Sequence, residues 1–198
     1  DVTKFPIIDA FLSVPREKFV PDGKREAAYI GENFQIGQNR IILEPRTLAK
    51  LLDALEINNG ELVLDIGSGL GYSSAIISLI AEVVIAVEDD SSLASEAEEI
   101  LSEIGVDNVV VQIGKLEDGA PEHGPYDVII LQGGVGDIPG SILNQLKNGG
   151  RIGAIFIEEG LGTAKIGFKL NEKITWRYSF NAAAPILPGF SKQKDFVL

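Results

Sequence analysis

The sequence predicts an α/β fold with a largely parallel sheet. Short apolar, β-branched segments alternate along the chain with segments of helical periodicity. One buried strand ends in a glycine-rich turn that opens directly into a helix. The length of 198 residues suits one domain with a sizeable core. We therefore expect a single domain over residues 1–198, with an N-terminal helical extension at 1–57 and a Rossmann-like core at 58–198.

The N-terminal extension is expected to contain two helices. Residues 5–14 have apolar side chains at helical spacing and then meet Pro15. Residues 15–37 are irregular, because prolines and glycines interrupt them repeatedly. A second helix is expected over residues 45–57, since Pro45 suits the first helical turn.

The core is expected to continue the alternation of strands and helices. The strands are expected at 62–64, 82–87, 109–113, 127–131, 151–156, 164–170 and 174–180. The helices are expected at 72–80, 91–101 and 138–146. The last two strands are expected to form a hairpin around residues 171–173.

The glycine-rich turn carries the clearest functional signal. Its glycines have no Cβ, so a ligand can approach the backbone closely. A dinucleotide-binding fingerprint would need a glycine at position 72, which is Tyr72. The pattern Asp65-x-Gly67-x-Gly69-x-Gly71 instead resembles the first motif of the seven-strand S-adenosylmethionine-dependent methyltransferases. The resemblance implies S-adenosyl-L-methionine as cofactor, with S-adenosyl-L-homocysteine as its product. The candidate cofactor-binding residues here are Asp65, Gly67, Ser68, Gly69 and Gly71.

An acidic residue follows the next strand at the spacing of a ribose-binding site. Glu88 lies 19 residues after Gly69, where a Rossmann-like fold holds a ribose diol. Asp89 is a further cofactor candidate beside it. Asp89 and Asp90 also suit the first turn of the helix that follows, since acids are favoured at a helix N-terminus.

Three segments outside the glycine-rich loop, taken together with the loop, indicate a particular family. Residues 14–21 read Val-Pro-Arg-Glu-Lys-Phe-Val-Pro, and together with residues 65–72, 121–127 and 145–151 they resemble the protein-L-isoaspartate O-methyltransferase family. The similarity spans residues 10 to 155, and residues 182–190 resemble a bacterial branch. The resemblance implies an enzyme that methylates isoaspartyl residues of proteins or peptides for repair. A cytoplasmic location is the default expectation, since no signal peptide is visible.

The chain departs from the family pattern where the substrate is expected. The family has a Thr-Ile-Ser-Gln-Pro segment, and this chain has Ile-Ile-Leu-Glu-Pro at 41–45. Leu43 therefore occupies the hydroxyl position, and Glu44 replaces an amide. Ile42, Leu43 and Glu44 are the candidate substrate-binding residues, and no residue is assigned a certain catalytic role. We expect Leu43 to present apolar surface to the reacting centre.

A second departure lies on the adenine side. The family has Gly-Asp after its third strand, whereas this chain has Gly114-Lys115. We expect Gly114, Lys115 and Leu116 to line the adenine. Lysine has no acceptor for the adenine amino group, so the backbone, Glu117 or Asp118 should accept that hydrogen bond.

Composition excludes several kinds of partner. The net charge of −12, from 29 acids and 17 bases, repels phosphate backbones and disfavours nucleic acid. The chain has no cysteine and one histidine, His123, and we expect no metal site. No apolar run is as long as a membrane span, so no membrane partner is expected. The sequence predicts no particular oligomeric state.

Three functional hypotheses remain open. The first is isoaspartyl methylation. The second is a cofactor-binding, regulatory relative that has lost substrate chemistry, and the third is a small-molecule methyltransferase. Arg40 and Arg46 flank the altered segment, and each either pairs with Glu44, attracts a substrate carboxylate or is solvated surface.

Overall fold

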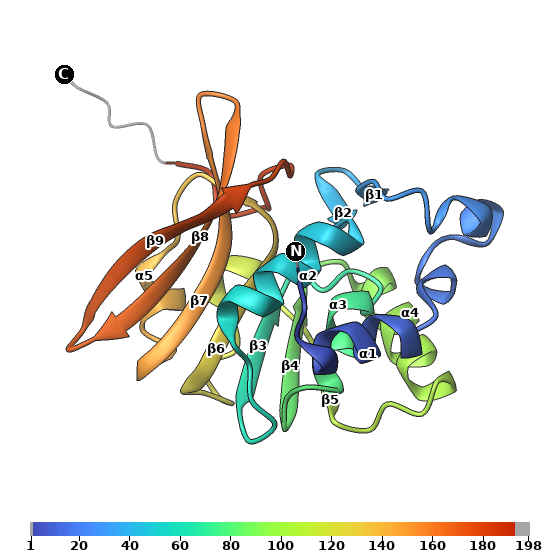
Figure 1. The fold of residues 1–198 in the computed structure, drawn as a ribbon, viewed down its shortest axis with the longest axis horizontal. Helices are drawn as coiled ribbons and strands as arrows, with labels where there is room; N and C mark the ends of the chain where they lie inside the picture. The colour runs from blue at the N-terminus through green and yellow to red at the C-terminus, as the bar shows by residue number, and fades with distance from the viewer. Residues whose placement is uncertain (1, 193–198) are drawn as a thin grey trace.

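A computed structural model describes residues 2–192 as a seven-stranded mixed sheet, a separate two-stranded hairpin and surrounding helices (Figure 1). The predicted domain ends, residue 1 and residues 193–198, lie outside the described part. The strands are β1 (Phe34–Gly37), β2 (Arg40–Ile42), β3 (Leu62–Ile66), β4 (Val83–Glu88), β5 (Val109–Ile113), β6 (Tyr126–Val135), β7 (Leu146–Glu158), β8 (Leu161–Leu170) and β9 (Lys173–Asn181). The α-helices are α1 (Phe5–Ser13), α2 (Pro45–Leu55), α3 (Tyr72–Ser78), α4 (Ser91–Glu103) and α5 (Gly140–Leu143). The 3₁₀ helices are η1 (Arg16–Phe19), η2 (Asp22–Ala27) and η3 (Leu116–Asp118).

The sheet order is β5-β4-β3-β6-β7-β8-β9. The first five strands in this order run parallel, and β7, β8 and β9 pair antiparallel through short turns. Strands buried on both faces need continuous apolar sequence, and β4 has it in Val-Val-Ile-Ala-Val. The predicted α/β, Rossmann-like fold is confirmed, including the hairpin between β8 and β9.

Hydrophobic side chains cover both faces of the sheet. One core cluster contains Leu51 of α2, Ile76 of α3 and Leu101 of α4, with Val63 from β3. The other contains Leu64 of β3, together with residues of α5 and η3. Neighbouring residues of β3 thus face opposite cores, as the period-two alternation of a strand requires. The carboxyl ends of the parallel strands meet at one edge of the sheet.

The helix predicted at residues 138–146 is wrong over most of its length. Only Gly140–Leu143 is helical, and Leu146 already belongs to β7, where it pairs with Tyr126. Residues 147–150, expected as a loop, form a bulge inside β7 opposite Asp127 of β6. Gly149, with φ of 86°, permits the irregular backbone of this bulge.

The hairpin of β1 and β2 lies in the N-terminal extension, where the sequence analysis expected no strands. Phe34 pairs with Ile42 and Gly37 with Arg40, and Asn39 takes the left-handed φ of 56° in the turn. This hairpin is a sheet of its own, and β2 contacts β6 of the large sheet. Within residues 2–192 no helix has the length and apolar character needed to cross a membrane.

Candidate cofactor site

The glycine loop joins the end of β3 to the start of α3 and lies beside the end of β4. The backbone N–H of Gly67 donates to the carbonyl of Val87 at 2.9 Å, which fixes the loop against β4. Gly67, Gly69 and Gly71 have φ angles of 77°, 57° and 89°, a region that residues with a Cβ rarely adopt. The three predicted glycines therefore form one turn at the edge where parallel strands of such folds bind ligands.

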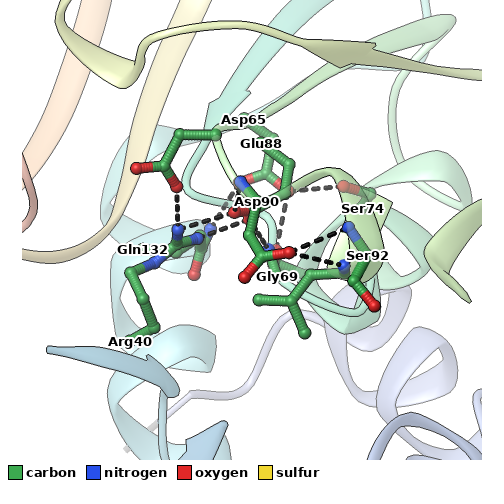
Figure 2. A network of polar contacts seen from close by, with 11 residues as sticks. Arg40, Asp65, Gly69, Ser74, Glu88, Asp90, Ser92 and Gln132 are labelled. Carbon is green, nitrogen blue, oxygen red and sulfur yellow. Dashed lines mark hydrogen bonds and ion pairs between the residues drawn. The ribbon is translucent and has the colours of Figure 1, made fainter. Parts of the chain in front are cut away.

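Asp65 is fully buried, and both of its carboxylate oxygens are held by neutral donors. The hydroxyls of Ser73 and Ser74, at the start of α3, each donate to Oδ2 at 2.6 Å. The amide of Gln132, on β6, donates to Oδ1 at 2.7 Å (Figure 2). Burial raises the pKa of Asp65, although these hydrogen bonds oppose the rise. Asp65 thus ties β3 to α3 and β6, and contact between its carboxylate and a cofactor stays a prediction.

Glu88, the last residue of β4, is also fully buried. Its Oε2 accepts the N–H of Gly69 at 2.7 Å, and its Oε1 accepts the N–H of Asp90 at 3.0 Å. The ribose-binding candidate therefore contacts the glycine loop directly (Figure 2). Asp90 caps α4 by accepting from the N–H groups of Ser92 and Leu93, as its predicted role in the first turn required.

Arg40 occupies the remaining face of the Glu88 carboxylate. Its Nη1 lies 2.6 Å from Oε1 and its Nη2 lies 2.5 Å from Oε2, and Nη1 also pairs with Asp89. The Arg40 side chain is 6% exposed. Two alternatives considered for Arg40, a pair with Glu44 and solvated surface, are therefore wrong, whereas Arg46 is exposed.

The opposing charges set the protonation of this pair. Burial alone would raise the pKa of Glu88, but the guanidinium of Arg40 outweighs burial and holds that pKa below its ordinary value. Burial alone would lower the pKa of Arg40, and the carboxylate raises it instead. Both groups are therefore charged and neutralise each other, while the Nε of Arg40 is buried without a hydrogen-bond partner among residues 2–192.

Two apolar side chains cover the glycine loop. A Cβ built on Gly69 would lie 2.5 Å from Cδ1 of Ile36, a residue of β1. A Cβ built on Gly67 would lie 3.3 Å from Cδ2 of Leu187 and 3.5 Å from Nη2 of Arg40. Leu187 is held there because its N–H donates to the carbonyl of Gly134 at 2.9 Å.

Ser68 and Gly71 play different parts in the same loop. The hydroxyl of Ser68 is buried and has no hydrogen-bond partner among residues 2–192, so it can bind a polar ligand group. A Cβ on Gly71 would lie 3.3 Å from Ala97 and from Leu101, so this glycine allows α4 to pack closely. The free hydroxyl of Ser68, the glycine backbone and the carboxylate oxygens of Glu88 are the kinds of group that bind an adenosyl cofactor. Arg40, however, already donates to both of those carboxylate oxygens.

The expected adenine segment follows β5 at the same edge of the sheet. The N–H of Gly114 donates to the carbonyl of Glu88 at 3.0 Å, so this segment is fixed to the end of β4. Leu116 is fully buried and Lys115 is exposed. Contact of Gly114, Lys115 and Leu116 with adenine stays a prediction.

Two of the three expected substrate residues, Ile42 and Leu43, are buried in the core. Leu43 is 1% exposed and packs in the same cluster as the α2 side chains, so it does not present open apolar surface here. Ile42 is 6% exposed. Glu44 is the N-cap residue of α2, and its Oε1 accepts from the hydroxyl of Thr47 at 2.6 Å. Their roles in substrate binding stay predictions.

Gln132, Ile36 and Leu187 were not among the candidate residues, and the pairing of Arg40 with Glu88 was not among the alternatives for that arginine. Gln132 and Leu187 belong to elements far along the chain from the glycine loop, and no local pattern marks them. The described residues contain no cluster of His, Cys, Asp or Glu that could hold a metal ion.

Comparison with solved structures defines the class of protein. The fold matches a protein-L-isoaspartate O-methyltransferase with a TM-score of 0.85 and 25% identity, covering 94% of this chain and 62% of that one. It also matches a putative protein-L-isoaspartate O-methyltransferase from Plasmodium falciparum, solved with S-adenosyl-L-homocysteine, with a TM-score of 0.81, 19% identity and coverage of 94% and 91%. The fold is that of the Rossmann-like methyltransferases.

The family follows from sequence. The chain belongs to the protein-L-isoaspartate(D-aspartate) O-methyltransferase family, whose model matches residues 2–167. It is 38% identical to protein-L-isoaspartate O-methyltransferase 1 of Rhodopseudomonas palustris over 146 residues, which are 74% of this chain and 60% of that protein. It is 34% identical to the Syntrophus aciditrophicus protein-L-isoaspartate O-methyltransferase over 170 residues, 84% of this chain and 78% of that one. The chain thus spans less than two thirds of the first of these relatives.

Proposed function

We propose that this chain is an S-adenosylmethionine-dependent O-methyltransferase that esterifies the abnormal carboxylate of isoaspartyl residues in proteins. The observation that carries the proposal is the family match over residues 2–167. The contact between Glu88 and the N–H of Gly69 supports the cofactor assignment, because it joins a diol acceptor to a glycine loop. Repair would follow because the ester can collapse to a succinimide and reopen.

The reaction asks little acid–base chemistry of the chain. S-adenosylmethionine, when bound, supplies a methyl group on a positively charged sulfur. The accepting carboxylate is already ionised near pH 7, so no general base is needed. The protein contributes orientation and the exclusion of water. This requirement suits a segment at 41–43 that is apolar and buried.

Leu43 should reduce the rate without abolishing the reaction. It replaces a hydroxyl that would donate one hydrogen bond to the substrate carboxylate, which is worth about 0.5–1.5 kcal/mol. The test is methyl transfer to an isoaspartyl peptide beside its normal aspartyl twin, with the wild type and Leu43→Ser. We expect slow transfer to the isoaspartyl peptide alone and faster transfer by Leu43→Ser. No transfer by either protein, with cofactor binding intact, would rule out isoaspartyl methylation.

A second candidate function is cofactor-linked regulation without isoaspartyl chemistry. Leu43 and Lys115 favour it, since each departs from the family pattern where the substrate or the adenine is expected. In that case the cofactor would bind, and neither the wild type nor Leu43→Ser would methylate the isoaspartyl peptide. Location in the cytoplasm and the lack of nucleic-acid, membrane or metal partners stay predictions from the sequence.

A further inference from the structure

The Glu88 carboxylate has no acceptor capacity left for a ligand. A carboxylate has about four lone-pair sites. Oε1 accepts from Arg40 at 2.6 Å and from the N–H of Asp90 at 3.0 Å. Oε2 accepts from Arg40 at 2.5 Å and from the N–H of Gly69 at 2.7 Å. The two backbone donors are fixed by the loop and by the start of α4, so only Arg40 can leave to admit a diol.

The same arginine also occupies space above the loop. Its Nη2 would lie 3.5 Å from a Cβ on Gly67, the position where a ligand should approach the backbone. Ile36, from the other strand of the same hairpin, covers Gly69. The β1–β2 hairpin therefore supplies both the positive charge that pairs with Glu88 and part of the apolar cover over the glycine loop.

This hairpin is joined to the seven-stranded sheet by side-chain packing and not by strand pairing, with Ile41 and Ile42 of β2 buried in the main core. It forms a separate two-stranded sheet, its pairing is irregular between Gln35 and Gly37, and the turn residues Gln38 and Asn39 are exposed. Short two-stranded ribbons are only marginally stable by themselves. Side-chain contacts, those of Arg40 with Glu88 and Asp89 and that of Ile36 with Gly69, hold its tip against the glycine loop.

We propose that Arg40 is an internal competitor of the cofactor: its guanidinium holds the diol acceptors of Glu88 until the β1–β2 hairpin withdraws it. Affinity for adenosyl ligands is then set by Arg40 as much as by Glu88. The proposal rests on the proposed use of S-adenosylmethionine. A neutral diol replaces a bidentate, charge-assisted pair, so the exchange weakens binding relative to an open site.

Calorimetry with S-adenosylhomocysteine tests the competition directly. We expect Arg40→Gln to bind at least tenfold more tightly than the wild type. Arg40→Lys, which keeps the charge and loses the two-pronged geometry, should fall between them. Arg177→Gln is the matched control, because it removes one exposed arginine from β9 at the far edge of the sheet. Its affinity should stay within twofold of the wild type.

A measurement on the wild type avoids any loss of folding in the variants. Saturation with S-adenosylhomocysteine should speed amide hydrogen exchange in residues 34–42, since the hairpin loses its anchor on Glu88. Equal or weaker binding by folded Arg40→Gln, or unchanged exchange in a wild type that binds, would overturn the competition while leaving the cofactor assignment intact. No binding by wild type, Arg40→Gln or Arg40→Lys would overturn both.

Discussion

The neighbouring ends of β3 and β4 each carry a fully buried carboxylate, and the two are satisfied in different ways. Asp65 accepts from neutral donors that belong to the core itself, Ser73, Ser74 and Gln132. Glu88 is paired with a guanidinium from a separate hairpin. A carboxylate held by donors of the sheet and its helices serves as an anchor, whereas one held by a side chain from a separate hairpin can exchange its partner. This is the difference we expect between a structural acid and the proposed ligand-binding acid.

The largest expected effect is on folding stability at Glu88. Glu88→Ala should lower the free energy of unfolding by about 3 kcal/mol, the lower end of the range for breaking a buried pair, because the partly exposed Asp89 is then the remaining counter-ion of buried Arg40. Urea denaturation measures this loss. Replacing both residues by methionine should restore most of the stability, since no unpaired charge remains. A double variant as unstable as Glu88→Ala would show that the unpaired guanidinium is not the cause.

The next effect separates the two acids in binding. In the Arg40→Gln background the acceptors of Glu88 are open to ligand. Adding Glu88→Gln should then weaken S-adenosylhomocysteine binding by about 1.5–3 kcal/mol, the range for hydrogen bonds to charged groups. Adding Asp65→Asn should cost much less, because Asp65 is satisfied within the core. Calorimetry measures the loss of S-adenosylhomocysteine affinity in each double variant. Equal losses would contradict the assignment of Asp65 as a structural acid and Glu88 as the proposed ligand-binding acid.

Lowering the pH should change the contributions of Glu88 and Asp65 to the free energy of unfolding in opposite directions. The folded pKa of Glu88 lies below its unfolded value, 4.5, so its stabilisation is present above pH 4.5 and is lost as the pH falls below it. The folded pKa of Asp65 lies above its usual 3.8, so its charge destabilises the fold above that raised pKa, and acid relieves the penalty. Unfolding free energy measured against pH should therefore fall less steeply in acid for Glu88→Gln and more steeply for Asp65→Asn. The same slope in all three proteins would contradict this assignment.

The smallest expected effect is that of removing one hydrogen-bond donor to Asp65. Ser74→Ala should cost about 1 kcal/mol of unfolding free energy, as one of several hydrogen bonds to Asp65 is lost. Ser95→Ala, on the exposed face of α4, should stay within about 0.5 kcal/mol of the wild type. Thermal denaturation of the pair checks the difference. Equal stability of the two variants would mean that Asp65 does not depend on this hydroxyl.

The fold could be predicted from the sequence wherever structure follows from local periodicity. The strands of the parallel sheet are apolar and β-branched, and α2 begins at the proline that marked it. The predicted helix at 138–146 failed because pairing with β6 draws Leu146 into a strand. The strand pairing there is a long-range contact that overrides the local helical pattern, and the spacing of nearby residues carries no information about such a contact.

The site could be predicted only in part. The glycine loop and Glu88 lie together, as their spacing indicated. The partner of Glu88 was missed because Arg40 lies 48 residues earlier in the chain, in a hairpin with a weak pattern. Arginine next to several acids also has no unique partner in sequence. Which acid it pairs with is set by the position of β2 against the end of the sheet.

A structure of the complex with S-adenosylhomocysteine tests the central claim most directly. We expect the ribose hydroxyls on Glu88, Arg40 withdrawn from that carboxylate, and Asp65 still bonded to Ser73, Ser74 and Gln132. A complex in which Arg40 remains paired with Glu88 while the ligand lies elsewhere would contradict the account.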